Sequence, residues 1–316
     1  MRKPLKYGRF ALINEDEKMK KESEKEMNLS IIIPDHNDLR LIDLVDSIDY
    51  ASTEKQKVEL VLVLNKPTVE LLQLVDKIKI KYCKKFDIKS VLIEICNLGY
   101  AYNAGIENAS YDNIMFLDSD LICIPNAIKK MVQCMEDKNA KIVKGIVWFE
   151  HNGFITKLIS NTRKVTTSKV KKAYIPVLLM NKNIFQELDD GYMFAVDTVW
   201  CADADFANRV DEKKIPVKYI KSDFLHPAIG LKKDLKDALY YGFGKGIRTK
   251  RTGESWKPCR EVADLVKSAK KERLSFLEYG YLVFWGTIMQ FGCLMQLFLP
   301  NHFFFPQSMK FDEGKV

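Results

Sequence analysis

The sequence lacks the cysteine patterns of zinc-binding and disulfide-rich domains. It contains no CxxC pair, and its seven cysteines are scattered over 316 residues: Cys83, Cys96, Cys123, Cys134, Cys201, Cys259 and Cys293. Most of them stand inside apolar runs, where a reduced cysteine packs as a small hydrophobic residue. We therefore expect a reducing compartment, which indicates the cytoplasm.

An N-terminal signal peptide is also lacking. Residues 1–10 are short and basic, and the highly charged run 14–26 follows where the apolar core of a signal peptide would stand. Residues 1–27 are therefore expected to form a charged leader. The body of the protein is not expected to be exported by that route.

Glycine-rich loops and linkers are scarce. No linker rich in proline or glycine occurs before about Gly230, and the first expected strand is followed by PDHND at residues 34–38. A nucleotidyltransferase also uses strand-end carboxylates and a metal ion, but we would expect it to carry a glycine-rich loop with Lys or Arg at this place. This enzyme class remains an alternative that the loop argues against.

The overall composition is that of a folded protein with a basic surface. Hydrophobic residues make up 47% and charged residues 29%, a balance that excludes global disorder. Lys and Arg number 50 against 42 Asp and Glu, so the formal net charge is +8. This charge suits an anionic partner such as a nucleotide diphosphate, a lipid phosphate or a membrane face. A non-catalytic membrane or polyanion binder is the alternative outside the enzymes, whereas a nucleic-acid partner is not expected.

Apolar runs of strand length alternate with helical patterns after residue 28. The expected strands are residues 29–33, 58–64, 91–95 and 114–117, and apolar residues recur at helical spacing over 39–48 and 71–78. This βαβαβ series predicts an α/β fold with a mostly parallel sheet covered by helices on both faces. Ligands of such sheets bind beyond the carboxyl ends of the strands.

Two carboxylates follow the fourth expected strand directly. Asp118 and Asp120 flank Ser119 after the apolar run 114–117. Both can reach one hard divalent cation, Mn²⁺ or Mg²⁺, directly or through water, and such an ion can bridge the diphosphate of a nucleotide-sugar. Taken alone, the triplet is better explained as a turn or a helix cap.

The surroundings of this triplet resemble family 2 glycosyltransferases. The runs NLGYAYNAGI (97–106) and DNIMFLDSD (112–120) are similar to that family's N-x-G and flDsD signature, and SIIIPDHN (30–37) resembles its opening segment. The resemblance implies a GT-A fold, which is Rossmann-like, and a nucleotide-sugar donor. Donor-binding residues are then Pro34, Asn37, Asn65, Asn97, Gly99, Asn103, Asp118 and Ser119.

A second stretch, further along the chain, also resembles family 2 glycosyltransferases. The runs LLMNKNIFQEL (178–188) and DADF (203–206), followed by Arg209, resemble the family's block around its catalytic base. Matched residue by residue, Asp203 is the general base that takes the proton of the acceptor hydroxyl, which implies an inverting transfer. Asp205 is interpreted as a helix-terminal charge worth ~0.3–1 kcal/mol that pairs with Arg209 at i,i+4.

Two further features are expected to face the diphosphate. His226, after the expected strand 217–220, stands where the family often has a histidine and would complete the metal shell begun by Asp118 and Asp120. The run YGFGKGIR (241–248) is expected to be a glycine-spaced loop whose Lys245 and Arg248 approach the diphosphate. A solvated basic turn beside an anionic membrane is the alternative for this run.

The sequence departs from the family pattern at two positions. Leu64 stands where many relatives have an aspartate that helps to hold the nucleotide base, and Ala202 stands where an acid precedes the catalytic base. Both departures bear on the choice of nucleotide and on the tuning of the base, and they leave the fold expectation unchanged.

A long uncharged segment lies near the C-terminus. Residues 279–299 carry no charged side chain and are long enough to cross a hydrocarbon core of about 30 Å. We expect contact with a membrane, either spanning or interfacial, and the alternatives are a buried helix or a homodimer-forming one. The enzyme would then work at the cytoplasmic face of a membrane, on a glycan, lipid-linked or surface-polymer acceptor.

The expected domain organisation follows from these segments. A GT-A domain covers residues 28–251, with a nucleotide-sugar half at 28–144 and an acceptor half at 145–251. A C-terminal extension covers residues 252–316, where the composition is basic and then hydrophobic.

Overall fold

The protein is built on one mixed sheet with helices on both faces. The computed structural model describes residues 27–52, 57–168 and 170–299, so nearly all of the expected leader and residues 300–316 lie outside the described residues. The strands are β1 (Leu29–Asp35), β2 (Val58–Asn65), β3 (Asp87–Ile93), β4 (Asn113–Phe116), β5 (Ile122–Cys123), β6 (Ile142–Phe149), β7 (Leu178–Asn181) and β8 (Val217–His226). The helices are α1 (Leu41–Ala51), α2 (Val69–Tyr82), α3 (Leu98–Asn108), α4 (Ala127–Asp137), α5 (Phe154–Arg163) with the π-helical turn η1 (Lys164–Ser168), α6 (Ile184–Leu188), α7 (Ala202–Glu212), α8 (Leu231–Thr252), α9 (Pro258–Lys271) and α10 (Phe276–Phe298).

The strand order is β3-β2-β1-β4-β7-β6-β8-β5. β1 pairs in parallel with both β2 and β4, which confirms the expected βαβαβ half. β7 inserts antiparallel between β4 and β6, and β5 pairs antiparallel with β8, so the sheet is mixed. The other strand pairs are parallel, in agreement with the expected mostly parallel sheet. Because position 145 falls inside β6, the two expected halves share this one sheet.

The expected strands agree with the observed ones where both faces of the strand are buried. All residues of β1 and β2 are buried, so the sequence shows them as continuous apolar runs. β3 is the outer strand and begins four residues before the expected run at 91–95. Its first residues are exposed or half-buried, so they carry no apolar pattern that the sequence could reveal.

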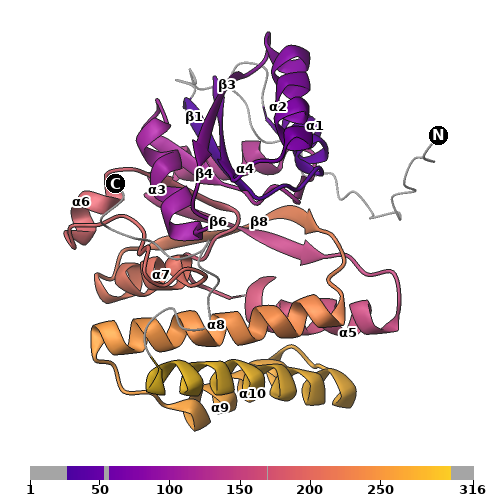
Figure 1. Cartoon of the computed structure of the whole chain (residues 1–316), viewed down its shortest axis with the longest axis vertical. Coiled ribbons are helices and arrows are strands. Elements are labelled where there is room, and N and C mark those ends of the chain that lie inside the picture. The colour runs from indigo at the N-terminus through magenta and orange to yellow at the C-terminus, as the bar shows by residue number, and fades with distance from the viewer. Residues whose placement is uncertain (1–26, 53–56, 169, 300–316) are drawn as a thin grey trace.

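Alternate residues of the strands enter two hydrophobic cores. Ile31 and Ile33 pack toward α1, α2 and α4, whereas Ile32 packs toward α3, α6 and α7 on the opposite face. Figure 1 shows the sheet between these helices, with the C-terminal helices forming a separate layer at the end of the molecule. The carboxyl ends of β1, β2 and β4 thus open toward the later part of the chain.

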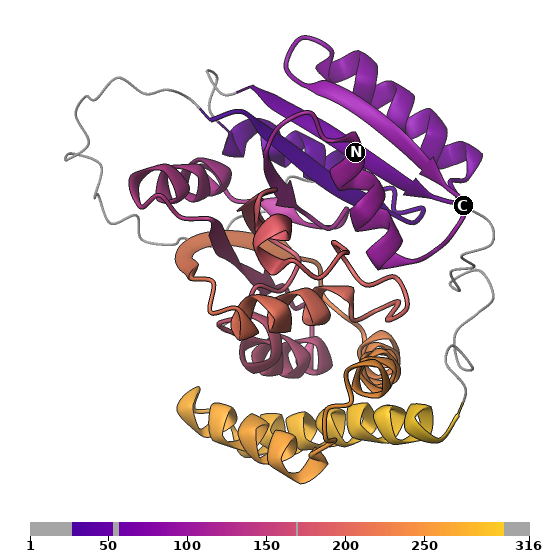
Figure 2. The same ribbon diagram turned by 90° about the vertical axis from the view of Figure 1, so that its left-hand side faces the viewer.

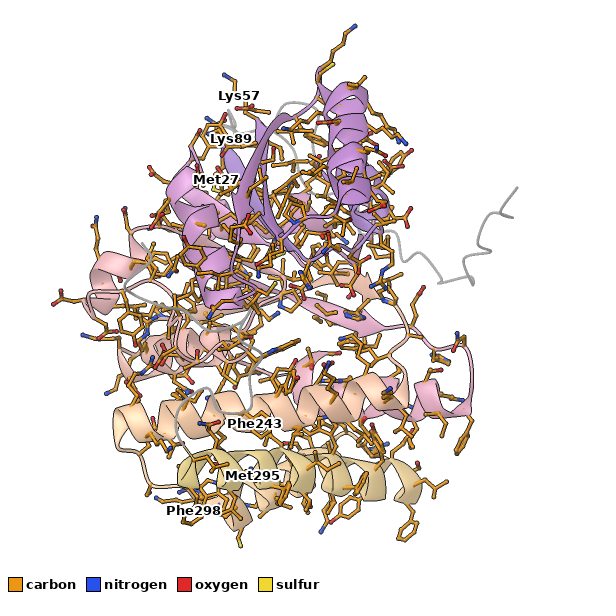
Figure 3. The ribbon with its side chains drawn as sticks, in the orientation of Figure 1. Met27, Lys57, Lys89, Phe243, Met295 and Phe298 are labelled. Carbon is orange, nitrogen blue, oxygen red and sulfur yellow. The ribbon has the colours of Figure 1, made fainter. Side chains whose placement is uncertain are left out.

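The run expected to be a basic loop is part of the C-terminal layer and is helical. The run 241–248 lies inside helix α8, so the expectation of a loop was wrong. Its glycines serve helix packing: a Cβ atom on Gly242 would lie 2.8 Å from the Cys293 nitrogen of α10, and one on Gly246 would lie 2.9 Å from the Cys293 oxygen. Figure 2 shows the helices of this layer at one edge of the molecule, and Figure 3 places Phe243 and Met295 where α8 meets α10.

The expected hydrophobic segment is a helix. α10 covers Phe276–Phe298, and within the described residues it is the one helix long and apolar enough to cross a membrane by length and composition, with a mean hydropathy of 1.3. Part of the helix is buried against α8 and α9. A core helix of a soluble protein can have the same length and composition.

Candidate active site

The loops that follow β1 and β2 are bound to each other. The Asn65 side chain donates to the Asp35 carbonyl at 3.0 Å, and Asn37 donates to the Lys66 carbonyl at 3.1 Å. The Thr68 N–H donates back to Asn37 at 2.7 Å. Asn37 and Asn65 therefore reach the expected edge of the sheet, where their amides hold the two loops in place.

Two further expected donor residues lie near the carboxyl ends of β1 and β4. Pro34 ends the apolar part of β1 in register with Val63 of β2. Ser119 is buried and its side chain interacts with the carboxylate of Asp35. Burial raises the pKa of Asp35 to about 6. The strand-end loops thus contain a buried carboxylate that sequence reasoning did not select.

The first signature run forms the N-terminal turn of α3 and holds a downstream loop. Asn97 caps the helix by accepting from the Tyr100 N–H at 3.0 Å, and donates to the Val196 carbonyl at 2.7 Å. Asn103 bonds Phe194 with both ends of its amide, at 3.0 and 2.9 Å. A Cβ atom on Gly99 would lie 2.5 Å from the Ala195 carbonyl oxygen. The motif therefore fastens residues 194–196 to α3.

Asp120 and His226 form a pair suited to a metal ion. The Oδ2 atom of Asp120 lies 3.3 Å from Nε2 of His226, at the end of β8. The His226 Nδ1 atom lies 2.7 Å from the Pro227 carbonyl, so Nδ1 carries the proton and Nε2 keeps a free lone pair. Burial lowers the pKa of His226, although the Asp120 charge opposes this, and a lowered pKa favours the neutral ligand form.

The remaining surroundings of this pair are cationic and aromatic. Arg40 donates to Asp120 Oδ2 at 3.1 Å and also pairs with Asp38. The Phe149 ring lies 4.8 Å from the His226 ring, centroid to centroid. Among the described residues, no three His, Cys, Asp or Glu side chains come together as a complete metal site. Asp118, the third expected ligand, is close enough to Asp120 for their charges to interact.

Asp118 and Asp203 come together with a lysine from β6. Desolvation raises the pKa of Asp118 to about 7, and the charges of Asp120 and Asp203 add to the rise. Desolvation also raises the pKa of Asp203 to about 7, opposed by hydrogen bonds from the Ala204 and Ile175 N–H groups and by the charge of Lys144. The site thus gathers two carboxylates whose pKa values lie near neutral pH, as acid–base chemistry requires.

Lys144 is the buried cation of this group. Its ammonium donates to the Pro176 carbonyl at 2.5 Å, next to the Ile175 N–H that bonds Asp203. Burial lowers the pKa of Lys144 to about 8, and the charges of Asp203 and Asp118 oppose that shift. The charges of Lys144, Asp118 and Asp203 therefore influence one another's pKa values.

Asp205, two residues after Asp203, has a structural environment. It is buried, bonds Arg209 at 3.1 Å and Tyr192 at 3.1 Å, and pairs with Arg251 of α8. The expected Asp205–Arg209 pair is present. Arg251 adds a connection between α7 and α8 that the i,i+4 spacing could not indicate.

Lys245 and Arg248 are paired within the C-terminal layer. Lys245 bonds Glu261 of α9, and Arg248 lies 2.9 Å from Glu254. Burial lowers the pKa of Lys245. Both cations therefore already have carboxylate partners, and their contact with a diphosphate remains a prediction.

Sequence reasoning missed Arg40, Lys144 and Asp35. Arg40 stands 80 residues from its partner Asp120, so no local spacing connects them. Lys144 stands inside an otherwise apolar strand, IVKGIVWF at residues 142–149, and a charged residue in a buried run is a signal that could have been read. Asp35 could have been found as the residue between Pro34 and the loop.

Comparison with solved structures shows a shared fold. The mannosyltransferase PcManGT from Pyrobaculum calidifontis, solved with GDP-Man and Mn²⁺, matches with a TM-score of 0.61 and 13% identity, over 86% of this chain and 88% of that one. S. aureus TarS residues 1–349 with UDP-GlcNAc match with a TM-score of 0.51 and 16% identity, over 79% and 73%. A longer S. aureus TarS structure matches with a TM-score of 0.51 and 14% identity, and this chain spans about half of its length, 54%.

Sequence comparisons agree on the family. Among curated proteins no match is found. The family model described as glycosyl transferase family 2 matches residues 30–188, which is half of the chain and includes the strand-end loops, the α3 signature and Asp118 to Asp120. This match shows that the chain belongs to glycosyl transferase family 2 and is a glycosyltransferase.

Proposed function

We propose that the enzyme is a metal-dependent, inverting glycosyltransferase that moves a sugar from a nucleotide-diphosphate sugar to an acceptor hydroxyl. The observation that carries the proposal is the 3.3 Å approach of Asp120 Oδ2 to His226 Nε2, with the histidine proton held at Nδ1 by Pro227. Two neighbours that share the fold were solved with such donors, UDP-GlcNAc and GDP-Man, and one of them with Mn²⁺.

Asp120 and His226 would hold Mn²⁺ or Mg²⁺, with Asp118 beside them. A carboxylate oxygen and an imidazole nitrogen suit Mn²⁺, and carboxylates with water suit Mg²⁺. The bound ion supplies positive charge opposite the leaving diphosphate. Because the described side chains form a pair and no complete site, the diphosphate of the donor would itself complete the shell.

Asp203 is the proposed general base. Its carboxylate accepts the proton of the acceptor hydroxyl while the hydroxyl oxygen attacks the anomeric carbon from the side opposite the diphosphate, so the configuration inverts. A pKa of about 7 keeps a useful fraction ionised and still basic at neutral pH. The Ala204 N–H, in the first turn of α7, orients the carboxylate.

The donor lies, in this proposal, along the edge formed by the ends of β1, β2 and β4. Pro34, Asn37, Asn65 and Ser119 shape the nucleoside side, and Asn97, Gly99 and Asn103 position the loop at 194–196. The amides of the four asparagines donate to backbone carbonyls, so these residues act by holding the walls of the site. Lys245 and Arg248 would reach a diphosphate only by leaving their carboxylate partners.

The acceptor is proposed to be a glycan, a lipid-linked sugar or a surface polymer, used at the cytoplasmic face of a membrane. The basic net charge and the apolar outer face of α10 support this location. A homodimer through α10 is the competing use of the same face.

Calorimetric titration of a nucleoside diphosphate with and without Mn²⁺ tests the metal site. Asp120→Ala should abolish the metal-dependent part of the binding, because one of the two ligands is lost. Asp112→Ala is the matched control, since Asp112 is exposed just before the other end of β4. Unchanged metal-dependent binding by Asp120→Ala would remove the main support for the proposal. A screen of donor hydrolysis across nucleotide-sugars identifies the sugar and the base.

A further inference from the structure

The inner face of α10 packs closely against α8. Gly242 and Gly246 let α8 approach the backbone of α10 at Cys293, and Gly292 lets α10 approach Leu239 of α8. Gln296 is buried on this face beside Gly246, and Gln290 is buried toward α9, where it donates to Glu261 at 2.7 Å. Lipid cannot satisfy buried polar side chains, and it cannot take the place of a partner helix in close backbone contact. α10 therefore stays on the protein, and spanning a membrane would require its removal from α8.

The outer face of α10 carries a stripe of large apolar side chains. Leu277, Phe284, Phe291 and Phe298 follow one another at intervals of seven residues, so they lie on one side of the helix. Their exposed fractions are 59, 53, 55 and 81%. We call these four residues the phenylalanine stripe. Figure 3 shows Phe298 at the outer side of the C-terminal layer, away from α8.

A groove beside α9 widens this apolar surface. Pro258, Val262 and Val266 of α9 line it together with Thr287 and Gln290 of α10. Thr287 is exposed between Phe284 and Phe291, so the groove continues the phenylalanine stripe. The apolar surface therefore covers neighbouring parts of two helices, and Figure 2 shows these helices at the edge of the molecule.

Cations gather at one end of this surface. Lys267, Lys270, Lys271 and Arg273 are exposed at the end of α9 and in the turn to α10. Lys267 is 77% exposed, and its contact with Asp264 is long, 3.4 Å. Each such cation is attracted to the negative surface potential of an anionic bilayer. The charge at the rim thus complements a negatively charged lipid surface, beside aromatic side chains that favour the headgroup boundary.

We propose that the phenylalanine stripe and this cationic end form a docking surface for an anionic lipid bilayer, with α10 lying in the plane of the interface. The inference extends the proposed function, on which it rests for the acceptor: a glycosyl acceptor carried by a lipid would be presented at the same surface. α8 lies between α10 and the site, since the charge of its Lys233 acts on Asp118 and the charge of Asp203 acts on its Tyr241. Two helix layers, α8 and α10, therefore lie between the site and the docking surface, a depth of about 20 Å.

Vesicle flotation of the full chain tests the surface. Binding is expected to vesicles of phosphatidylcholine with phosphatidylglycerol, and to weaken in phosphatidylcholine alone or at about 0.5 M salt. Phe284→Glu combined with Phe291→Glu should reduce binding about tenfold or more, because two inserted rings are replaced by charges. Lys270→Glu with Lys271→Glu should reduce only the component that depends on phosphatidylglycerol.

Ile80→Glu is the matched control. Ile80 is 77% exposed on α2, at the end of the molecule opposite the C-terminal layer (Figure 1), and this variant should bind vesicles normally. The proposal is overturned if the full chain does not float with either vesicle. It is equally overturned if the chain sediments as a dimer that the paired Phe variant converts to a monomer, without vesicle binding. Donor hydrolysis separates the two proposals: floating without hydrolysis supports the docking surface and counts against the transferase site.

Discussion

The guanidinium of Arg40 lies 3.1 Å from Oδ2 of Asp120, the same oxygen that faces His226. Arg40 also pairs with Asp38, and its side chain is 45% exposed. The Arg40 guanidinium thus already lies beside the proposed metal ligand. It would compete with a bound metal ion for Oδ2 of Asp120.

Arg40→Ala should therefore tighten the binding of Mn²⁺ measured without nucleotide. A partly exposed ion pair is worth about 0.2–1 kcal/mol, so the gain should be no more than about fivefold. Manganese titration followed by electron paramagnetic resonance measures it. Arg40→Lys, which keeps the charge, is the control. Equal affinities in all three proteins would show that Arg40 does not compete.

Asp203→Asn should lower sugar transfer by about 10²-fold or more while donor affinity barely changes, because the amide cannot accept the acceptor proton. Asp211→Asn is the control, since Asp211 lies on the same helix and is 46% exposed. Steady-state transfer and nucleotide titration give the two quantities. Normal turnover by Asp203→Asn would assign the base to another residue.

The rate of transfer should rise with pH through about 7. Asp203 acts in its ionised form, and burial raises its pKa to about 7, so acid removes the active form. Because Asp118 titrates in the same range, the observed midpoint belongs to the coupled pair. Profiles of kcat/KM against pH measure it.

Lys144→Met should move that acidic limb to higher pH. The Lys144 charge stabilises the ionised carboxylates, so its removal raises their pKa further. Lys141→Met is the control, because Lys141 stands just before the same strand and is 53% exposed. If the midpoint of the acidic limb does not move and the rate is lower at every pH, Lys144 acts only through packing.

Asp118→Asn should stabilise the metal-free protein at alkaline pH. The folded-state pKa of about 7 lies above the ordinary aspartate pKa of 3.8, so the folded protein binds the extra proton and loses stability as the pH rises through this range. The amide removes that dependence, and the free energy of unfolding at pH 8 should rise by about 1–3 kcal/mol. Urea denaturation in chelator at pH 5 and pH 8 measures it. A variant less stable than the parent at pH 8 contradicts the prediction.

Asp205→Asn should cost more stability than a helix-terminal charge would. Asp205 is 3% exposed and holds Arg209, Arg251 and Tyr192, so the loss of its charge leaves the buried Arg209 poorly paired, at about 3 kcal/mol or more. Asp190→Asn, on the solvent side of Arg209, should cost less than about 1 kcal/mol. Denaturant titration compares the two variants. Equal losses would place the effect outside the buried network.

Features with a local cause could be predicted from the sequence. The buried strands β1 and β2 show as apolar runs because both of their faces are covered. Asp118 and Asp120 stand two and four residues after the end of β4, so their place at the sheet edge follows from the strand itself. The asparagines and glycines of the α3 signature marked a special turn, whose bonds to residues 194–196 only the structure reveals.

Features that join distant segments were decided by the tertiary structure. The sequence places Lys144 inside β6, but its approach to Asp203 depends on how β6, β7 and α7 pack. The run at 241–248 is helical because α10 lies against its glycines; without that partner, glycines at this spacing favour a loop. The sequence therefore determined which residues can act as acids, bases or metal ligands. Packing decided which of them meet, because side-chain contacts depend on the whole arrangement of helices and strands.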